Sequence, residues 1–263
     1  MPKAKILFLD IETAPILASV WSIWNVNIGL NQIERDWSIL SFAAKWLDEK
    51  KIIYHDVSKE KNFNDDKKLL GHLHKLLDKA NLVVAQNGRR FDIPKINARM
   101  IVQGFKPPSP YKVVDTKDIA KKHFSFTSNR LEHLSKLLCV QKKDTHKKFP
   151  GFELWQECLK GNPKAWKEMK FYNIQDTLTL EELYLKLRGW TSSHPNVSTF
   201  DDEEVPQCPK CGGTHVNRKG MAVTTVGKYQ EYQCQDCGSW SRGSILKNTK
   251  EKRKSLLRVI NNG

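Results

Sequence analysis

The 263-residue sequence has no long apolar run. A membrane-spanning helix needs about 18 to 20 consecutive apolar residues, and the apolar stretches here are shorter. The run near the N-terminus, in MPKAKILFLDIET, is too short for a signal peptide and is interrupted by Asp10 and Glu12. We therefore expect no membrane contact, no export and a cytoplasmic location.

Acidic residues are scarce relative to basic ones. The chain has 29 Asp and Glu against 44 Lys and Arg, which gives a formal net charge of +15. Such an excess favours polyanionic partners, because neutralising phosphates releases condensed counterions. Nucleic acid is the first partner to consider, although charge by itself fits a solvated basic surface equally well.

Cysteine is also scarce, and its pattern does not indicate disulfides. Four of the six cysteines form two C-x-x-C-G motifs: Cys208, Cys211, Cys234 and Cys237. The glycines permit the left-handed backbone of a tight turn, in which two thiolates can face one ion. Four thiolates suit tetrahedral zinc, so the module resembles a zinc ribbon with one structural Zn²⁺. Cys139 and Cys158 stand alone and are expected to be small buried hydrophobes.

Two roles are open for the predicted ribbon. As a folding staple it would use zinc because so small a unit cannot build an adequate core. It also carries cations and an aromatic residue of the kind that grip single strands, namely Lys210, Arg218, Lys219, Lys228, Trp240 and Arg242. We favour a staple that also contacts nucleic acid, and docking of a protein partner stays open.

The chain length suits one α/β core with a smaller appendage. Periodicity stops at Trp190, and a Ser, Pro and Asn-containing stretch with an acidic run at 201–204 follows. We predict a main domain over residues 1–190, a linker over 191–206, the ribbon over 207–243 and a basic tail over 244–263. We find no internal repeat.

The main domain alternates between two kinds of pattern. Short apolar runs predict strands at 4–13, 38–47, 51–56 and 81–87. Three- and four-residue spacing of leucines, with start and stop signals, predicts helices near 69–77, 94–104, 129–139 and 163–188. Strands that alternate with helices imply an α/β fold, with a mixed sheet and helices on its faces.

Acidic side chains recur at positions that could bring them together. On a strand, Asp10 and Glu12 point to the same face because side chains alternate. On a helix, Tyr172 and Asp176 share a face because they are four residues apart. Asp92 follows a predicted strand and precedes Pro94, which places it at a helix N-terminus. Convergence would create strong repulsion unless cations share the site.

Carboxylate oxygens favour Mg²⁺ or Mn²⁺ over zinc. Two such ions about 3.5–4 Å apart would clamp the attacking and leaving oxygens of a phosphodiester displacement. We therefore expect two catalytic Mg²⁺ or Mn²⁺ ions in addition to the structural zinc.

The residues around these acids resemble the three motifs of the DEDD exonucleases. Residues 8–13 (FLDIET) are similar to the first motif, 87–92 (NGRRFD) to the second, and 172–176 (YNIQD) to the third in its tyrosine form, Y-x-x-x-D. Phe171 stands where the histidine subtype would have histidine. The resemblance spans about residues 4–188. It is strongest to proofreading domains of family B DNA polymerases and to small phage-type exonucleases, and it implies an RNase H-like fold.

The resemblance also implies roles for single residues. Asp10, Glu12 and Asp176 would hold one metal ion, Asp10 and Asp92 the second, and Tyr172 would orient the attacking water. Contacts with the substrate are expected from three further residues of the motifs, Asn87, Phe91 and Thr13.

The implied activity is 3′→5′ hydrolysis of single-stranded DNA to nucleoside 5′-monophosphates, in replication or repair, in a bacterium or a phage-infected cell. A DNA polymerase is a candidate partner. An exoribonuclease stays open because nothing in the sequence senses a 2′-hydroxyl. A weakly active nucleic-acid-binding module of a replication complex is a further alternative.

Other polar and aromatic residues near the motifs have weaker signals. Asp115 and Asp118 follow a strand-like run, where they could line the site or start a helix, and we favour the helix start. Trp21 and Trp24 follow the first motif in a segment that could be a loop. They could stack on a terminal base or pack within the protein.

Overall fold

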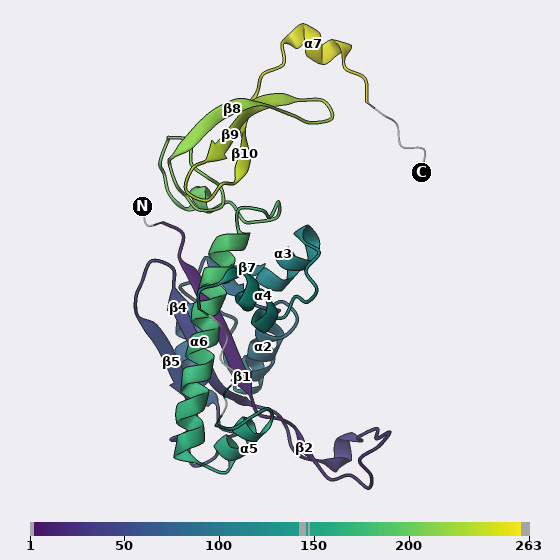
Figure 1. Cartoon of the computed structure of the whole chain (residues 1–263), viewed down its shortest axis with the longest axis vertical. Helices are drawn as coiled ribbons and strands as arrows, with labels where there is room; N and C mark the ends of the chain where they lie inside the picture. Colours follow the sequence, from purple (N-terminus) through teal and green to yellow (C-terminus); the bar gives the residue numbers. More distant parts are fainter. Residues whose placement is uncertain (1–2, 142–145, 147, 259–263) are drawn as a thin grey trace. The chain divides into compact units, whose positions relative to one another are not determined.

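The computed structural model describes residues 3–141, 146 and 148–258 (Figure 1). Contacts divide the chain into two units. The first spans residues 5–184, and the second combines residues 1–4 with residues 185–263. Each unit is described separately. Residues 259–263 of the predicted basic tail lie outside the described residues.

A five-stranded mixed sheet forms the centre of the first unit. The strand order is β5 (Ile52–Asp56), β4 (Ile39–Trp46), β1 (Ile6–Thr13), β6 (Leu82–Ala85) and β7 (Lys112–Asp115). β1 is antiparallel to β4 and parallel to β6, while β5 is antiparallel to β4 and β7 is parallel to β6. The predicted α/β fold with a mixed sheet is confirmed, and β1, β4, β5 and β6 coincide with the predicted apolar runs.

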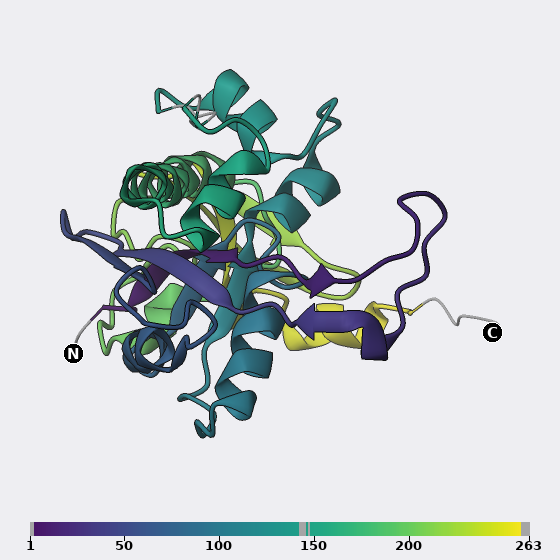
Figure 2. The ribbon, with the colours of Figure 1, turned by 90° about the horizontal axis from the view of Figure 1, so that it is seen from below.

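β1 is the central strand and has neighbours on both edges. Its apolar residues Leu7, Phe8 and Leu9 are fully buried, because helices cover the sheet on both sides (Figure 2). Towards its C-terminal end the burial pattern changes, so that Asp10 and Glu12 are half-buried while Ile11 between them is buried. The alternation expected from the sequence is present.

The helices of this unit include the four predicted from leucine spacing, one whose start was expected near Asp115, and one that was not predicted. They are α1 (Lys67–Leu77), α2 (Asp92–Val102), α3 (Thr116–His123), α4 (Leu131–Leu138), α5 (Glu153–Leu159) and α6 (Pro163–Leu187). The predicted helices correspond to α1, α2, α4 and α6. α2 begins two residues earlier than Pro94, which is compatible with a proline in the first turn of a helix. α5 is the helix that was not predicted, because its seven residues form no recognisable apolar stripe.

An apolar arm connects β1 to β4. It contains β2 (Leu17–Ala18), η1 (Leu30–Gln32) and β3 (Ile33–Arg35), and β2 pairs with β3 in an antiparallel way. Trp21 is 100% exposed and Trp24 is 76% exposed. These tryptophans are therefore not packed inside the protein, which was one of the two roles considered for them.

The second unit contains a three-stranded antiparallel sheet. The strand order is β10 (Trp240–Leu246), β9 (Lys228–Cys234) and β8 (Val216–Val223), and α7 (Lys250–Ser255) follows. The stretch predicted as a linker contains η2 (Val197–Phe200). Val197 is buried, and its backbone N–H donates to the Pro209 carbonyl at 2.8 Å. This part of the stretch thus contacts the cysteine module.

None of the helices in the described part of the chain is long and apolar enough to cross a membrane.

Asp66 connects three elements of the first unit. Its carboxylate is fully buried, accepts from the Ile39 backbone N–H at the start of β4 (3.0 Å), and pairs with Arg99 of α2 at 2.7 Å. Gln103 also donates to it, at 3.0 Å. Because α1 begins at the next residue, one carboxylate links the start of β4 and two helices.

We predict that Arg99→Met lowers the free energy of unfolding by about 3–5 kcal/mol, since it leaves the Asp66 carboxylate buried without its cation. Urea denaturation would measure this change. Lys68→Met removes an ion pair whose lysine is 80% exposed, and it should cost less than about 1 kcal/mol. Equal effects of the two substitutions would contradict the role given to Asp66.

Candidate active site and metal centre

Three of the predicted acids converge at the C-terminal end of β1. Asp10 and Glu12 come from β1 and Asp176 comes from α6. One carboxylate oxygen of each lies within 4.8 Å of those of the other two. Asp176 is buried, whereas Asp10 and Glu12 are half-buried. The two-residue spacing on the strand and the position on the helix therefore create one acidic cluster.

Asp92 is next to this cluster but is not one of the three. It is the first residue of α2, it is buried, and its Oδ1 accepts from the backbone N–H of Ile11 at 3.2 Å. Burial, with a smaller contribution from Asp115, raises the pKa of the Asp92 carboxyl to about 7. A cation bound nearby would favour the ionised form and act in the opposite direction.

Asn173 belongs to the site, although its place in the sequence does not indicate this. Its side chain is fully buried, and its Nδ2 donates to Asp10 Oδ2 at 2.6 Å and to the Asp10 carbonyl at 3.2 Å. Ser41 Oγ donates to Asn173 Oδ1 at 3.1 Å, which fixes the orientation of the amide. Asn173 therefore positions the Asp10 carboxylate.

Asn173 belongs to a row of polar contacts between β4 and α6. Ser41 contacts Asn173, the Ala43 carbonyl accepts from Thr177 Oγ1 at 3.3 Å, and Lys45 Nζ pairs with Glu181 at 2.6 Å. Two residues along a strand cover about 6.8 Å and four along a helix about 6 Å, so the two repeats match. We call these three contacts the β4–α6 polar row. The row fixes the register of the helix that carries Asp176.

A buried carboxylate shapes the second motif. Asp115 accepts from the backbone N–H groups of Asn87 (2.9 Å) and Arg89 (3.1 Å), and it also caps α3 by accepting from Lys117 and Asp118. The helix start expected near this residue is confirmed. Asn87 has a left-handed backbone, with φ of 66°.

Gly88 allows the chain to turn closely against β6. A Cβ atom at this position would lie 2.3 Å from the Ala85 Cβ, which is incompatible with any other residue unless the backbone moves. Asp115 and Gly88 together hold the Asn87 side chain in place, and its Oδ1 accepts from Lys117 Nζ at 3.1 Å.

A pocket of about 280 Å³ joins the acids to this turn. Asp10 and Asp176 line it together with two cations, Lys117 and Arg130. Three side-chain amides, at Gln86, Asn87 and Asn129, and a further carboxylate, Glu132, also line it. If the acids had bound cations, an anionic ligand that reached them would also meet the positive charge of Lys117 and Arg130 and the hydrogen-bonding amides of the pocket.

Tyr172 is buried one helical turn before Asp176, in contact with two aromatic rings. The ring centroid of His146 lies 4.9 Å away and that of Trp155 6.1 Å away, both in edge-on geometry. Aromatic rings prefer such edge-to-face contacts. The packing limits the rotation of the Tyr172 ring, and neither neighbour had been recognised from the sequence.

The remaining predicted contact residues flank the acids. Thr13 ends β1, and the register with β4 shifts between Glu12 and Thr13. Phe91 directly precedes Asp92, is 38% exposed, and lies under Lys95, whose Nζ is 5.3 Å from the ring centroid. Part of the Phe91 side chain is therefore exposed beside Asp92.

The acidic cluster fits hard divalent cations. Its donors are carboxylate oxygens, which suit Mg²⁺ or Mn²⁺. The charges of Asp10, Glu12 and Asp176 lie within 4.8 Å of one another, so a cation would relieve their repulsion. Asp10, Glu12 and Asp176 are the residues that would hold a first ion.

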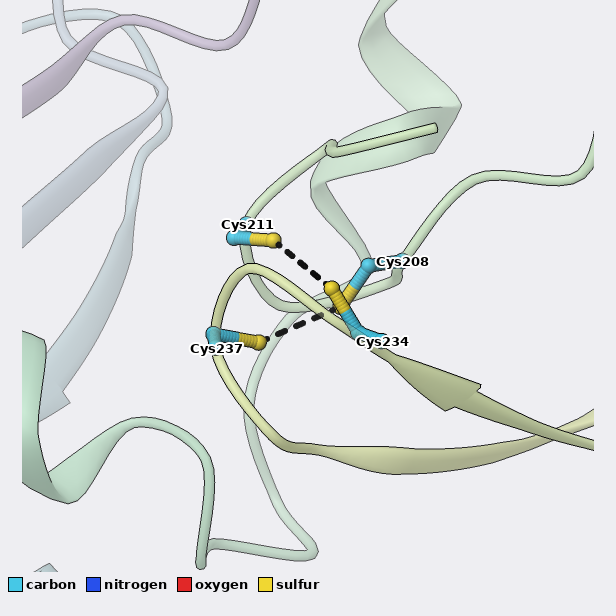
Figure 3. A group of neighbouring side chains, drawn as sticks. All are labelled: Cys208, Cys211, Cys234 and Cys237. Atoms are coloured by element: carbon cyan, nitrogen blue, oxygen red, sulfur yellow. Dashed lines mark hydrogen bonds between the residues drawn. The ribbon is translucent and has the colours of Figure 1, made fainter. Parts of the chain in front are cut away.

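The four motif cysteines form the second candidate metal site. Their sulfur atoms all lie within 4.8 Å of one another and point to a common centre (Figure 3). The Cys208 and Cys237 sulfurs are 3.6 Å apart, as are those of Cys211 and Cys234. Tetrahedral zinc with bonds of about 2.3 Å requires sulfurs about 3.8 Å apart, so the spacing fits.

The backbone around the cysteines has the expected form. Gly212 and Gly238 have φ of 73° and 72°, and the N–H of each donates to the carbonyl of the first cysteine of its motif. The left-handed glycines predicted from the sequence are confirmed. Hydrogen bonding to Cys211 and Cys237 lowers the pKa of the Cys208 thiol, while burial raises that of Cys234.

The lone cysteines are not part of either site. Cys139 and Cys158 are buried, as predicted. Burial is the main reason that the pKa of Cys158 is raised to about 12, and negative charge on Asp56 and Glu12 raises it further. Cys158 is therefore a thiol at neutral pH and a poor nucleophile.

The sequence matches the family described as the RNase_H superfamily over residues 7–188. Among solved structures, the chain is similar to the family B DNA polymerase from the hyperthermophilic archaeon Pyrobaculum calidifontis, with 14% identity and a TM-score of 0.48. The similarity covers 72% of this chain and 26% of that polymerase chain. The comparison with curated proteins gives no match.

We predict that Asn173→Ala weakens Mn²⁺ binding at the acidic cluster by about 10–100-fold, because Asp10 loses the amide that orients it. Isothermal titration calorimetry would measure the affinity, and circular dichroism would verify that the variant folds. Gln175→Ala is the matched control, since this amide is on the same helix and contacts Gln141. Unchanged affinity in a folded Asn173 variant would refute the positioning role.

We also predict that the purified chain carries one Zn²⁺, which native mass spectrometry would detect. Cys211→Ser should lose the ion because it removes one of four thiolates. Cys139→Ala removes a buried thiol outside the cluster and should keep full zinc content. Retention of one zinc by the Cys211 variant would contradict the assignment of ligands.

Proposed function

Because this chain belongs to the RNase H superfamily, we propose that it is a metal-dependent 3′→5′ exonuclease that acts on single-stranded DNA. The products would be nucleoside 5′-monophosphates. The observation that carries this proposal is the cluster of Asp10, Glu12 and Asp176, whose carboxylate oxygens lie within 4.8 Å of one another. The order of the acids along the chain, and their resemblance to the DEDD motifs, support it.

The chain's own residues have distinct parts in the proposed reaction. Bound divalent cations would supply charge stabilisation and the activation of water. Asp10, Glu12 and Asp176 would hold the first ion, and Asp10 and Asp92 would hold the second. Asn173 keeps Asp10 in the orientation that binding requires. The Tyr172 hydroxyl would orient the attacking water, and the packing of its ring against His146 restricts the positions that this hydroxyl can take.

Substrate contacts are assigned to the residues around the acids. Asn87 presents an amide to the pocket, and Thr13 and Phe91 flank the acids along the chain. The exposed ring of Phe91 could stack on a base. Lys117 and Arg130 line the pocket and would attract the phosphate that follows the terminal nucleotide.

We expect labelled single-stranded DNA to shorten from its 3′ end in the presence of Mg²⁺ or Mn²⁺, and Asp10→Ala to reduce the rate at least about 100-fold. Denaturing gels of substrates labelled at the 3′ or the 5′ end would reveal the direction. Asp202→Ala, which removes an exposed carboxylate in the other unit, should leave the rate unchanged.

The same assay with RNA decides the sugar preference and separates the alternatives. If RNA is shortened and DNA is not, the protein is an exoribonuclease. Binding of both nucleic acids without hydrolysis under any metal condition would refute the catalytic proposal, and it would favour a binding module of a replication complex. If DNA is hydrolysed, we propose that a DNA polymerase is a partner of this protein.

A further inference from the structure

The C-terminal part of the chain concentrates positive charge. Residues 207–258 contain eleven Lys and Arg against three Asp and Glu, a net charge of +8. The whole chain has a net charge of +15, so more than half of it lies in about a fifth of the sequence. The zinc site explains how this unit folds, but it does not explain its charge.

Part of this charge surrounds a groove on the three-stranded sheet. The ribbon groove, with a volume of about 450 Å³, is lined by residues of β8, β9 and β10 and by residues 204–207. Its exposed cations are Arg218, Arg242 and Lys247, and Glu204 is the carboxylate among the lining residues. The size is within the range of sites for small organic ligands, roughly 300–1,000 Å³.

An aromatic ring lies in this groove beside the cations. Tyr232 is the cross-strand neighbour of Arg218 on one side and of Ser241 on the other. Gly243 borders the ring, and a Cβ there would be 3.6 Å from it, so the absence of a side chain leaves room over the tyrosine. Arg242 is the cross-strand neighbour of Glu231, and its guanidinium carbon lies 4.0 Å from the ring centroid of Tyr229, which is outside the groove lining.

We propose that the ribbon groove is a second nucleic-acid site, which binds single-stranded DNA or RNA through phosphate contacts and base stacking. Arg218, Arg242 and Lys247 neutralise phosphates, and Tyr232 stacks on an unpaired base. A duplex would not suit the ring, because its bases are already stacked on one another. The proposal concerns binding only and does not depend on hydrolysis at the acidic cluster.

The test is binding of a fluorescein-labelled single-stranded 20-mer to the full, zinc-loaded chain without Mg²⁺ or Mn²⁺. Fluorescence anisotropy would give the affinity over a range of salt concentrations. Changing Arg218, Arg242 and Lys247 together to glutamine should weaken binding about 10–100-fold at 0.1 M salt. The slope of log affinity against log salt should fall by about 2, since each single-strand phosphate contact contributes about 0.7.

The matched control changes three exposed lysines of the other unit, Lys50, Lys51 and Lys59, to glutamine. It alters net charge by the same amount, so a loss equal to that of the groove variant would overturn the proposal. Zinc content measured on every variant excludes unfolding of the ribbon as the cause. Lack of any loss in the zinc-loaded groove variant would overturn the proposal as well.

Tyr232→Leu separates stacking from charge. It should weaken binding several-fold with an unchanged salt slope, because no phosphate contact is lost. Polyglutamate tests the class of ligand, and it should compete poorly with the oligonucleotide. Equal competition by polyglutamate at the same charge, together with no effect of Tyr232→Leu, would identify an acidic protein segment as the occupant and refute the nucleic-acid site.

Discussion

Three mutually repelling carboxylates must be held close together in the first unit, and this requirement constrains the elements around them. Asp10, Glu12 and Asp176 lie within 4.8 Å of one another, and charges this close raise each other's cost of ionisation. A flexible arrangement would relax by moving them apart. The acids stay close because each comes from a rigid element, a central strand or a long helix, and because neighbouring groups hold those elements in register.

The β4–α6 polar row supplies much of that rigidity. Its contacts connect backbone or side-chain atoms of β4 with Asn173, Thr177 and Glu181 on successive turns of α6. The first of these residues also bonds to Asp10, so the contact that fixes the helix fixes the acid as well. Buried polar groups of this kind are costly when unpaired, and a shift of α6 by one residue would unpair all of them.

Features of the fold and of the site could be predicted where the sequence pattern that indicates them is local. The alternation around Asp10 and Glu12, the four-residue step from Tyr172 to Asp176 and the glycines of the cysteine motifs are local patterns, and each is present in the structure. The role of Asn173 was not predictable in this way. An asparagine inside a helix has no periodic signature, and its partners Ser41 and Asp10 are more than 130 residues away in the chain.

Two further differences have the same origin. The seven residues of α5 are too few to show a stripe, although two of them are fully buried. The apolar arm contains the kind of residues that normally form a core, and composition gave no indication that Trp21 would be entirely exposed. Burial depends on which surfaces meet, and a single sequence does not record that directly.

The position of β1 between β4 and β6 has a consequence for how the protein opens. Amide hydrogens of a central strand exchange with solvent mainly when the whole unit unfolds, whereas arms and terminal segments exchange through local fluctuations. Leu7 and Leu9 are fully buried, and the backbone that follows them carries Asp10 and Glu12. Partial openings of the chain can therefore come and go while the positions of Asp10 and Glu12 survive, and global unfolding erases them.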